Sequence, residues 1–135
     1  MAQENEIIVY QPDSSFSLEV RIEDETVWLN RNQIATLFDR DVKTIGKHIN
    51  NALKEELQGL PTVANFAIVQ IEGSRTVKRN IEFYNLDVIL SVGYRIKSPR
   101  GVLFRSWANK VLEEHMLKEY QKLVSTVTTD WKFLT

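Results

Sequence analysis

The stretch that decides the fold is NRNQIATLFDRDVKTIGKHINNALKEEL, residues 30–57. Apolar residues recur there at spacings of three and four on both sides of residues 39–41, which is the pattern of two amphipathic helices. Asn30 is placed to cap the first helix, and Asp41 is placed to cap a second one that we expect to end near Leu57. Two short helices joined by a tight turn predict a helix-turn-helix.

The turn departs in one place from the commonest pattern. Asp39 occupies the position where many helix-turn-helix motifs carry glycine, and aspartate adopts the left-handed conformation at a higher cost. Ala35 is small enough to let the two helices approach closely. Gly46 opens a gap in the second helix, either for DNA or for the neighbouring helix, and the sequence does not choose between them.

The second predicted helix carries polar side chains on a face separate from its apolar stripe. In a helix-turn-helix this helix enters the major groove, where Lys donates to guanine and Thr contacts the thymine methyl group. The expected base-reading residues are Lys43, Thr44, Lys47, His48 and Asn51. An ordinary solvated helix face would have the same composition, so this alternative stays open.

Two strand-like runs, at residues 66–71 and 76–84, surround a glycine-containing turn and predict a β-hairpin. A hairpin that follows a helix-turn-helix is a wing. The cations of the wing, of the helix pair and of a predicted helix start at Pro99 are candidates for phosphate binding. These residues are Arg31, Arg40, Arg75, Lys78, Arg79 and Arg100.

The remaining segments complete an α+β pattern. Strand-like runs at 7–10, 17–22 and 26–29 predict a small antiparallel sheet. Asn85 is placed to cap a third helix, and Ser98 to cap a long fourth helix that we expect to reach about Leu123.

The long helix has a broad apolar side, and the end of the chain has no clear period. That apolar side comprises Leu103, Trp107, Val111, Met116, Tyr120 and Leu123. We expect homodimerisation through Trp107, Val111 and Met116, with packing of this side on the sheet as the alternative. Trp28, Trp107 and Trp131 are interpreted as packing anchors. A segment that folds back is one interpretation of residues 125–135.

The sequence therefore predicts an α+β winged helix-turn-helix with an N-terminal antiparallel β segment and a long C-terminal helix. We expect one domain with three parts. They are a β segment at residues 1–29, the helix-turn-helix with its hairpin wing at 30–84, and a helical region at 85–135.

The net charge of −1 hides an uneven distribution. Residues 1–27 carry seven acids and one base, whereas residues 28–112 carry thirteen bases and seven acids. A partner responds to the potential within a Debye length of about 8–10 Å, not to the total charge. The basic middle segment therefore fits a nucleic-acid partner.

Several function classes find no support in the sequence. Without cysteine there are no disulfides or thiolate metal sites, and His48 and His115 lie far apart. We find no phosphate-binding glycine loop and no metal-ligand spacing, so we expect no enzyme activity, no cofactor and no metal. No apolar run reaches the roughly 18–20 residues of a membrane span, and no signal peptide is visible, which favours a cytoplasmic protein.

Two stretches together carry a family resemblance. VWLNRNQIATLFDRDVKTIGKHI, residues 27–49, followed by IEFYNLDVILSVGYRIKSPRGVLFRSWANKVL, residues 81–112, resembles the virulence RhuM family of bacterial proteins. The resemblance extends over about residues 5–120. It implies a DNA-binding protein of a kind often found near mobile elements, and similar modules occur in phage antirepressor-type proteins.

We therefore expect sequence-specific binding of double-stranded DNA, in transcription regulation or in the service of a mobile element. The alternative is an antirepressor-like module that binds another regulatory protein. The acidic first 27 residues would favour a basic protein partner in that case.

Overall fold

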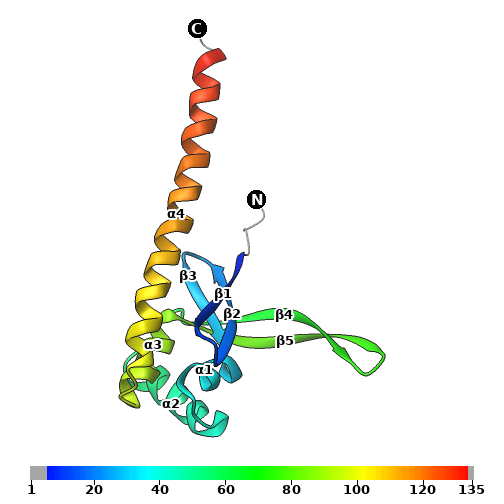
Figure 1. The fold of residues 1–135 in the computed structure, drawn as a ribbon, viewed down its shortest axis with the longest axis vertical. Helices are drawn as coiled ribbons and strands as arrows, with labels where there is room; N and C mark the ends of the chain where they lie inside the picture. Colours follow the sequence, from blue (N-terminus) through cyan, green and yellow to red (C-terminus); the bar gives the residue numbers. More distant parts are fainter. Residues whose placement is uncertain (1–5, 134–135) are drawn as a thin grey trace.

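A five-stranded antiparallel sheet and four helices make up the described part of the chain, residues 6–133, in the computed structural model (Figure 1). The strand order is β1-β2-β3-β5-β4. The elements are β1 (Glu6–Asp13), β2 (Phe16–Glu23), β3 (Thr26–Asn30), α1 (Arg31–Phe38), α2 (Val42–Glu55), β4 (Val63–Glu72), β5 (Arg75–Asn85), α3 (Leu86–Arg95) and α4 (Arg100–Phe133). The predicted α+β class, the N-terminal antiparallel strands and the long last helix are confirmed.

Capping side chains start the three shorter helices at the predicted positions. The Asn30 side chain accepts a hydrogen bond from the Gln33 amide at 2.9 Å, and the Gln33 side chain accepts one from the Asn30 amide, which completes a capping box. Asp41 accepts from the Thr44 amide at 3.1 Å at the start of α2. At the start of α3, the Asn85 side chain accepts a hydrogen bond from the Val88 amide.

The helix ends are less well predicted than the helix starts. α2 ends at Glu55 and not at Leu57. The interpretation of residues 125–135 as a fold-back segment is wrong as far as Phe133, because α4 continues to that residue. No glycine or proline follows Gly101 in the sequence, so nothing interrupts the helix.

The β4–β5 hairpin is much longer than its contact with the rest of the sheet. The two strands pair from Val63↔Tyr84 out to Glu72↔Arg75. β3, in contrast, pairs with β5 only from Trp28↔Asn85 to Asn30↔Phe83. The outer part of the hairpin therefore extends from the body as a two-stranded ribbon (Figure 1).

The core lies between one face of the sheet and the helices. Fully buried side chains come from β2, β3 and all four helices; they include Ile22, Leu29, Ile34, Phe38, Ile45, Ile49, Val88, Ile89 and Phe104. Burial of apolar surface of this kind is the main favourable term in folding. Both helices of the α1–α2 pair contribute, so the position of α2 is fixed by the core.

The α3–α4 corner closes through a pair of glycines. A Cβ atom at Gly93 would lie 3.0 Å from Cζ of Phe38 and 3.5 Å from Cα of Gly101. The Ser98 amide donates to the Gly93 carbonyl at 3.0 Å and shapes the loop between the two helices. The motif VGYRIKSPRG thus forms a tight helix corner over the Phe38 ring.

Two of the three tryptophans pack as predicted. Trp28 is buried, and its indole nitrogen donates to the Glu23 carbonyl at 2.9 Å. The Trp107 ring lies 4.8 Å from the Tyr10 ring of β1, and Val111 is buried nearby. Packing on the sheet, the alternative to dimerisation, is therefore confirmed for Trp107 and Val111. Trp131 lies outside the residues whose side chains are described.

Among the described residues, no helix has the length and apolar character that a membrane crossing would require.

Candidate nucleic-acid interface

α2 presents one apolar and one polar face. Its buried residues are Ile45, Gly46, Ile49 and Ala52. The opposite face is exposed, whereas His48 is half-buried at its edge. The exposed side chains of this face include Lys43, Thr44, Lys47 and Asn51, four of the five residues predicted to read bases.

The turn before α2 adopts the backbone conformation that the sequence requires of Asp39. Its φ of 52° and ψ of 54° lie in the left-handed region, so the left-handed conformation expected of Asp39 is confirmed. The Arg40 amide donates to the Ala35 carbonyl at 3.0 Å, which closes the end of α1. The Thr44 hydroxyl lies 3.5 Å from Oδ2 of Asp41, so it has a weak partner within the cap.

Gly46 makes room for a side chain of the neighbouring helix. A Cβ atom there would lie 3.4 Å from the Nη1 atom of Arg31 and 3.5 Å from its Cδ. This contact decides between the two interpretations of Gly46 in favour of the neighbouring helix. The Arg31 guanidinium also lies beside Tyr84 of β5: burial raises the pKa of that phenol, and the nearby Arg31 charge partly opposes the rise.

A groove separates the start of α2 from the hairpin. It has a volume of about 420 Å³ and is lined on one side by α1 and the first residue of α2, and on the other side by the hairpin. Its lining residues include Arg31, Asn32, Val42, Gln70, Asn80 and Glu82. The groove therefore brings the α2 N-terminus and the base of the ribbon to one surface. Glu82 contributes an acidic group to that surface.

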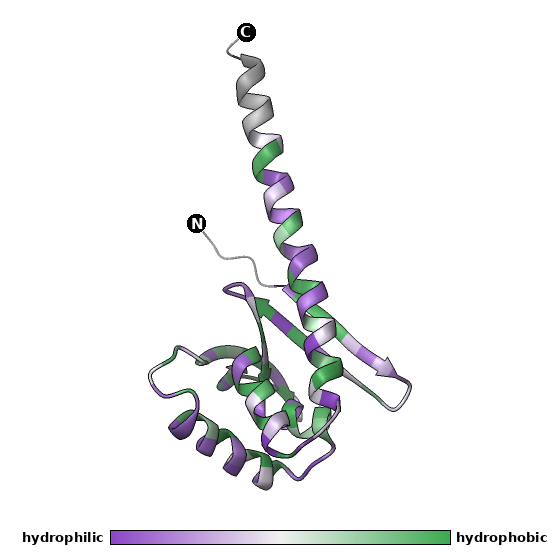
Figure 2. Ribbon diagram, turned by 90° about the vertical axis from the view of Figure 1, so that its left-hand side faces the viewer, coloured by the Kyte–Doolittle hydropathy of each residue, from purple (hydrophilic) through white to green (hydrophobic). Residues whose placement is uncertain are grey.

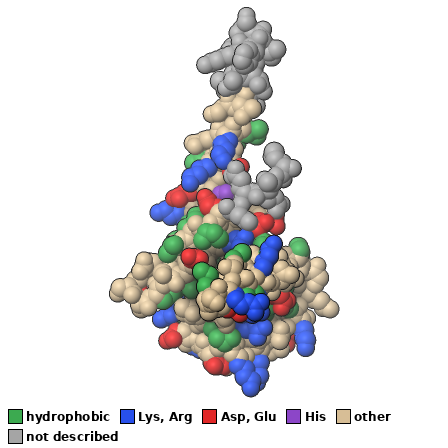
Figure 3. Space-filling view, turned by 90° about the vertical axis from the view of Figure 1, so that its right-hand side faces the viewer, with side chains coloured by type: hydrophobic (Ala, Val, Ile, Leu, Met, Phe, Trp, Pro, Cys, Tyr) green, Lys and Arg blue, Asp and Glu red, His purple; other side chains and the backbone are tan. Residues whose placement is uncertain are grey.

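The hairpin cations fall into two classes. Arg79 forms a bidentate ion pair with Glu72, with Nε···Oε2 at 2.7 Å and Nη2···Oε1 at 2.8 Å, and this contact lowers the pKa of the Glu72 carboxyl. Arg75 and Lys78 are exposed and have no ion-pair partner among the described residues. Because side chains alternate along a strand, Lys78 shares the face of Tyr84, which lines the groove. Figure 3 shows Lys and Arg side chains on this side of the molecule and at its lower end.

Two other predicted phosphate contacts are used inside the fold. Arg40 donates a hydrogen bond from Nη1 to the Phe38 carbonyl at 3.0 Å. Arg100 donates from Nη1 to the Leu37 carbonyl at 3.1 Å and lies over the Phe16 ring at 5.5 Å. These arginines hold the end of α1 and the start of α4, so we leave them out of the proposed interface.

Asn50 belongs to the exposed face of α2 and was missed by the sequence reasoning. It follows Lys43 by seven residues and Lys47 by three, which is the spacing of neighbours on one side of a helix. This sequence spacing could have identified Asn50 as part of the face that carries the two lysines. The exposed Lys54 continues the same face toward the C-terminus of α2.

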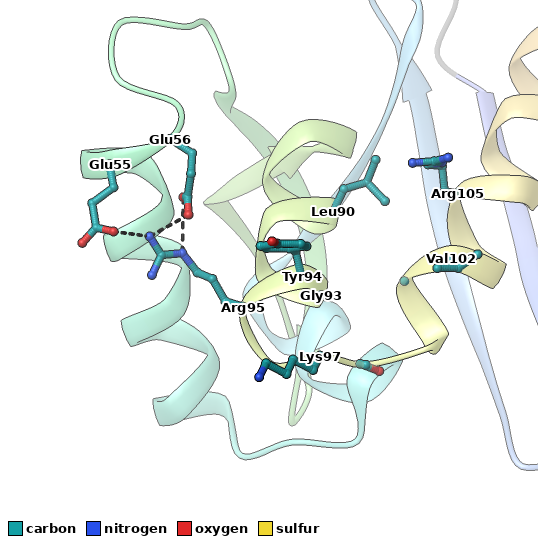
Figure 4. A pocket seen from close by; sticks show the side chains of 11 residues that line it. Glu55, Glu56, Leu90, Gly93, Tyr94, Arg95, Lys97, Val102 and Arg105 are labelled. Carbon is teal, nitrogen blue, oxygen red and sulfur yellow. Dashed lines mark hydrogen bonds and ion pairs between the residues drawn. The ribbon is translucent and has the colours of Figure 1, made fainter.

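A second hollow, of about 610 Å³, lies between the end of α2, α3 and the start of α4 (Figure 4). Nη2 of Arg95 lies 2.6 Å from an oxygen of Glu55 and 2.8 Å from one of Glu56, which joins α3 to the end of α2. Both carboxylates raise the pKa of Arg95. Tyr94 and Val102, which also line the hollow, are 85% and 68% exposed.

Among the described residues, no group of three or more His, Asp or Glu side chains lies close enough to bind a metal ion. His115 instead lies with Nδ1 at 3.1 Å from Oε1 of Glu6, which joins α4 to β1.

The fold and this surface define an α+β protein with a packed helix pair and a basic β-ribbon. Residues 61–125 match the model of the Virulence protein RhuM family. The resemblance is thereby confirmed over the hairpin, α3 and most of α4, while the α1–α2 pair lies outside the matched residues. No curated protein and no solved structure matches the chain.

Proposed function

We propose that the protein is a sequence-specific double-stranded DNA-binding protein of the winged helix-turn-helix type. In this proposal α2 is the recognition helix and the β4–β5 ribbon is the wing. The observation that carries it is the exposure of Lys43 and Lys47 on α2, on the side opposite the buried Ile45 and Ile49. The ribbon adds two exposed cations, Arg75 and Lys78, that have no ion-pair partner in the part of the chain that the structure describes.

The dimensions of α2 suit this role. Its 14 residues correspond to about 21 Å of helix. The major groove of B-DNA is about 12 Å wide and admits an α-helix. Lys43, Lys47 and Asn51 follow one another at four-residue spacing, so their side chains reach toward the same groove. Asn50 and Thr44 flank this row, and His48 lies at its edge.

The phosphate contacts would come from a smaller set than the sequence predicts. Arg31, Arg75 and Lys78 are exposed and lie along the groove and the ribbon. Each phosphate contact adds about −0.9 to the slope of log affinity against log salt. Three such contacts therefore correspond to a slope near −2.7, before any contribution of the α2 lysines.

Binding to a random-sequence duplex at low salt, followed by fluorescence anisotropy, tests this proposal. We expect Lys43→Ala/Lys47→Ala to lower affinity at least about tenfold and to make the salt slope shallower by about 1.8. Lys97→Ala/Arg105→Ala removes the same charge near the second hollow and should change affinity by no more than about twofold. Circular dichroism verifies that each variant is folded.

If the two double variants lost DNA affinity equally, net charge alone would account for the affinity, and the proposed role of α2 would be contradicted. Selection of bound duplexes from a random pool then measures sequence preference, and an unenriched pool would contradict specific reading. Regulation of transcription or service to a mobile element is the biological setting that we propose.

A second candidate, a protein-interaction module, is favoured by one observation. Tyr94 and Val102 are large exposed side chains at the rim of the second hollow, a combination typical of protein-docking surfaces. A regulatory protein bound there would form a complex without nucleic acid. Its affinity would fall after Tyr94→Ala and would be unchanged after Lys43→Ala/Lys47→Ala.

A further inference from the structure

The long helix α4 has two halves with different surroundings. In the first half, Gly101, Phe104, Ala108 and Val111 are buried against the rest of the chain. The contact of His115 with Glu6 is at the end of this half. From Met116 to Thr126 all side chains are exposed, and α4 leaves the body there (Figure 1).

The second half carries an apolar stripe that its own chain leaves exposed. Its members are Met116 (51% exposed), Leu117 (53%), Tyr120 (63%), Leu123 (62%) and Val124 (42%). Hydrophobic and hydrophilic positions alternate along this part of the helix in Figure 2. We name these five residues the distal stripe.

The distal stripe does not continue the face that packs on the body. With 3.6 residues per turn, its centre is rotated by about 150° from the line through Phe104, Ala108 and Val111. The body-facing line continues instead into Lys118, Lys122 and Thr126, which are polar. The helix thus changes its apolar side where it leaves the body, and the new side needs a different partner.

The spacing of the distal stripe is that of a coiled coil. Leu117, Tyr120 and Val124 occupy successive a, d and a positions of a heptad, and Met116 and Leu123 lie beside them. Charged residues are absent from the stripe. Lys122 and Glu119 pair with each other at 3.7 Å on the other side of the helix.

We propose that the distal stripe pairs with the distal stripe of a second copy of this chain, as a parallel two-helix coiled coil. An uncharged stripe does not select an acidic or a basic partner, whereas an identical stripe offers the same spacing and register. If pairing covered all the exposed surface of these five residues in both copies, it would bury on the order of 1,000 Å² in total, which is about the minimum for a specific interface.

The parallel orientation rests on the proposed function, whereas the pairing itself does not. Parallel pairing places both α2 helices at the same end of the dimer. Dimeric helix-turn-helix proteins place their recognition helices one turn of DNA apart, about 34 Å. Antiparallel pairing would put the two α2 helices at opposite ends.

Sedimentation equilibrium of the purified protein tests the pairing without DNA. We expect a reversible dimer, and we expect Leu117→Lys to raise its dissociation constant at least about tenfold, because the lysine would enter the apolar seam. Thr126→Lys introduces the same charge on the opposite side and should change the constant by no more than about twofold. A monomer at every concentration, or equal effects of the two variants, would overturn the proposal.

Disulfide formation tests the orientation. The chain has no cysteine, so a single introduced cysteine can form a disulfide only between copies. In a parallel dimer facing a positions fall within the Cα–Cα range of about 4.4–6.8 Å that a disulfide spans. Leu117→Cys and Val124→Cys should therefore each cross-link with themselves under mild oxidation, and Lys118→Cys should not.

In an antiparallel pair an a position faces a d position, so cross-linking only in a mixture of Leu117→Cys or Val124→Cys with Tyr120→Cys would show an antiparallel pair and overturn the parallel arrangement. Loss of DNA binding in the α2 variants leaves these results unchanged. Failure of the DNA-binding proposal and failure of the pairing proposal are therefore distinguishable.

Discussion

Two cationic regions of this molecule use their charges in opposite ways. On α2 and the hairpin, Lys43, Lys47 and Lys78 are exposed and have no ion-pair partner among the described residues. At the α3–α4 corner, Arg95 is held by two carboxylates and Arg100 by a backbone carbonyl. The first region has charge available for a partner, and the second uses charge to fix helices.

This difference shows that the number of Lys and Arg residues in a sequence is not the number of cations available to a partner. Residues 28–112 contain thirteen bases, yet Arg79, Arg95 and Arg100 are engaged within the chain. Arginine suits such internal contacts, because its planar group donates several hydrogen bonds in a fixed geometry. Among the described residues, the lysines of α2 have no such partner.

The largest effect on stability is expected at the α3–α4 corner. Gly93→Ala should lower the free energy of unfolding by about 2 kcal/mol, because the new methyl group would meet the buried Phe38 ring at 3.0 Å. Gly101→Ala, where the nearest atom is 3.6 Å away, should stay within about 1 kcal/mol of the parent protein. Urea unfolding measures both, and equal losses would contradict the tight contact at Gly93.

A smaller effect separates engaged from available cations. Arg100→Met should cost about 1 kcal/mol of stability, because the Leu37 carbonyl would lose its 3.1 Å hydrogen bond. Lys47→Met, on the exposed face of α2, should change stability by less than about 0.5 kcal/mol. A larger loss for Lys47→Met in the same urea experiment would show that α2 depends on its lysines for folding.

The smallest expected effect is a pH dependence that involves one tyrosine from each region. Burial raises the pKa of Tyr10, which packs beside α4, and that of Tyr84, which lines the groove, from the ordinary value of 10.0. Above about pH 10 the unfolded chain loses these phenolic protons while the folded chain keeps them, so stability should fall as pH rises.

Urea midpoints between pH 8 and pH 11 measure this fall. Tyr10→Phe and Tyr84→Phe should each make the decline shallower, because each removes one titrating group. Arg31→Gln should steepen it, because the Arg31 charge lowers the pKa of Tyr84. If stability declined equally with pH in the parent protein and in all three variants, the assignment of this pH dependence to Tyr10 and Tyr84 would be contradicted.

Local signals predicted most of the fold. Asn30, Asp41 and Asn85 each mark a helix start, because a side-chain oxygen at that place satisfies a free amide of the first turn. The turn conformation at Asp39 follows from the same kind of local chemistry. These features depend on neighbours in sequence, so the sequence alone is sufficient to place them.

Contacts between distant residues were not predictable in this way. The hydrogen bond from Arg100 to Leu37 joins residues 63 positions apart, and the partner of Gly46 is a side chain of another helix. The apolar residues of α4 formed one broad side in the sequence. Trp107 and Val111 face the body, whereas Met116 and Tyr120 lie on the distal stripe, because the apolar side rotates where the body ends.

The length of the β4–β5 ribbon has a consequence for handling the protein. β4 is the edge strand of the sheet, and Val69 and Ile71 on it are 64% and 80% exposed. An open strand edge with apolar side chains can add strands from other molecules and start aggregation. The ion pair of Glu72 with Arg79 places two charged groups next to this apolar pair, and charged groups in such a place oppose strand addition. Concentrated solutions should therefore remain clear longest where that carboxylate is ionised.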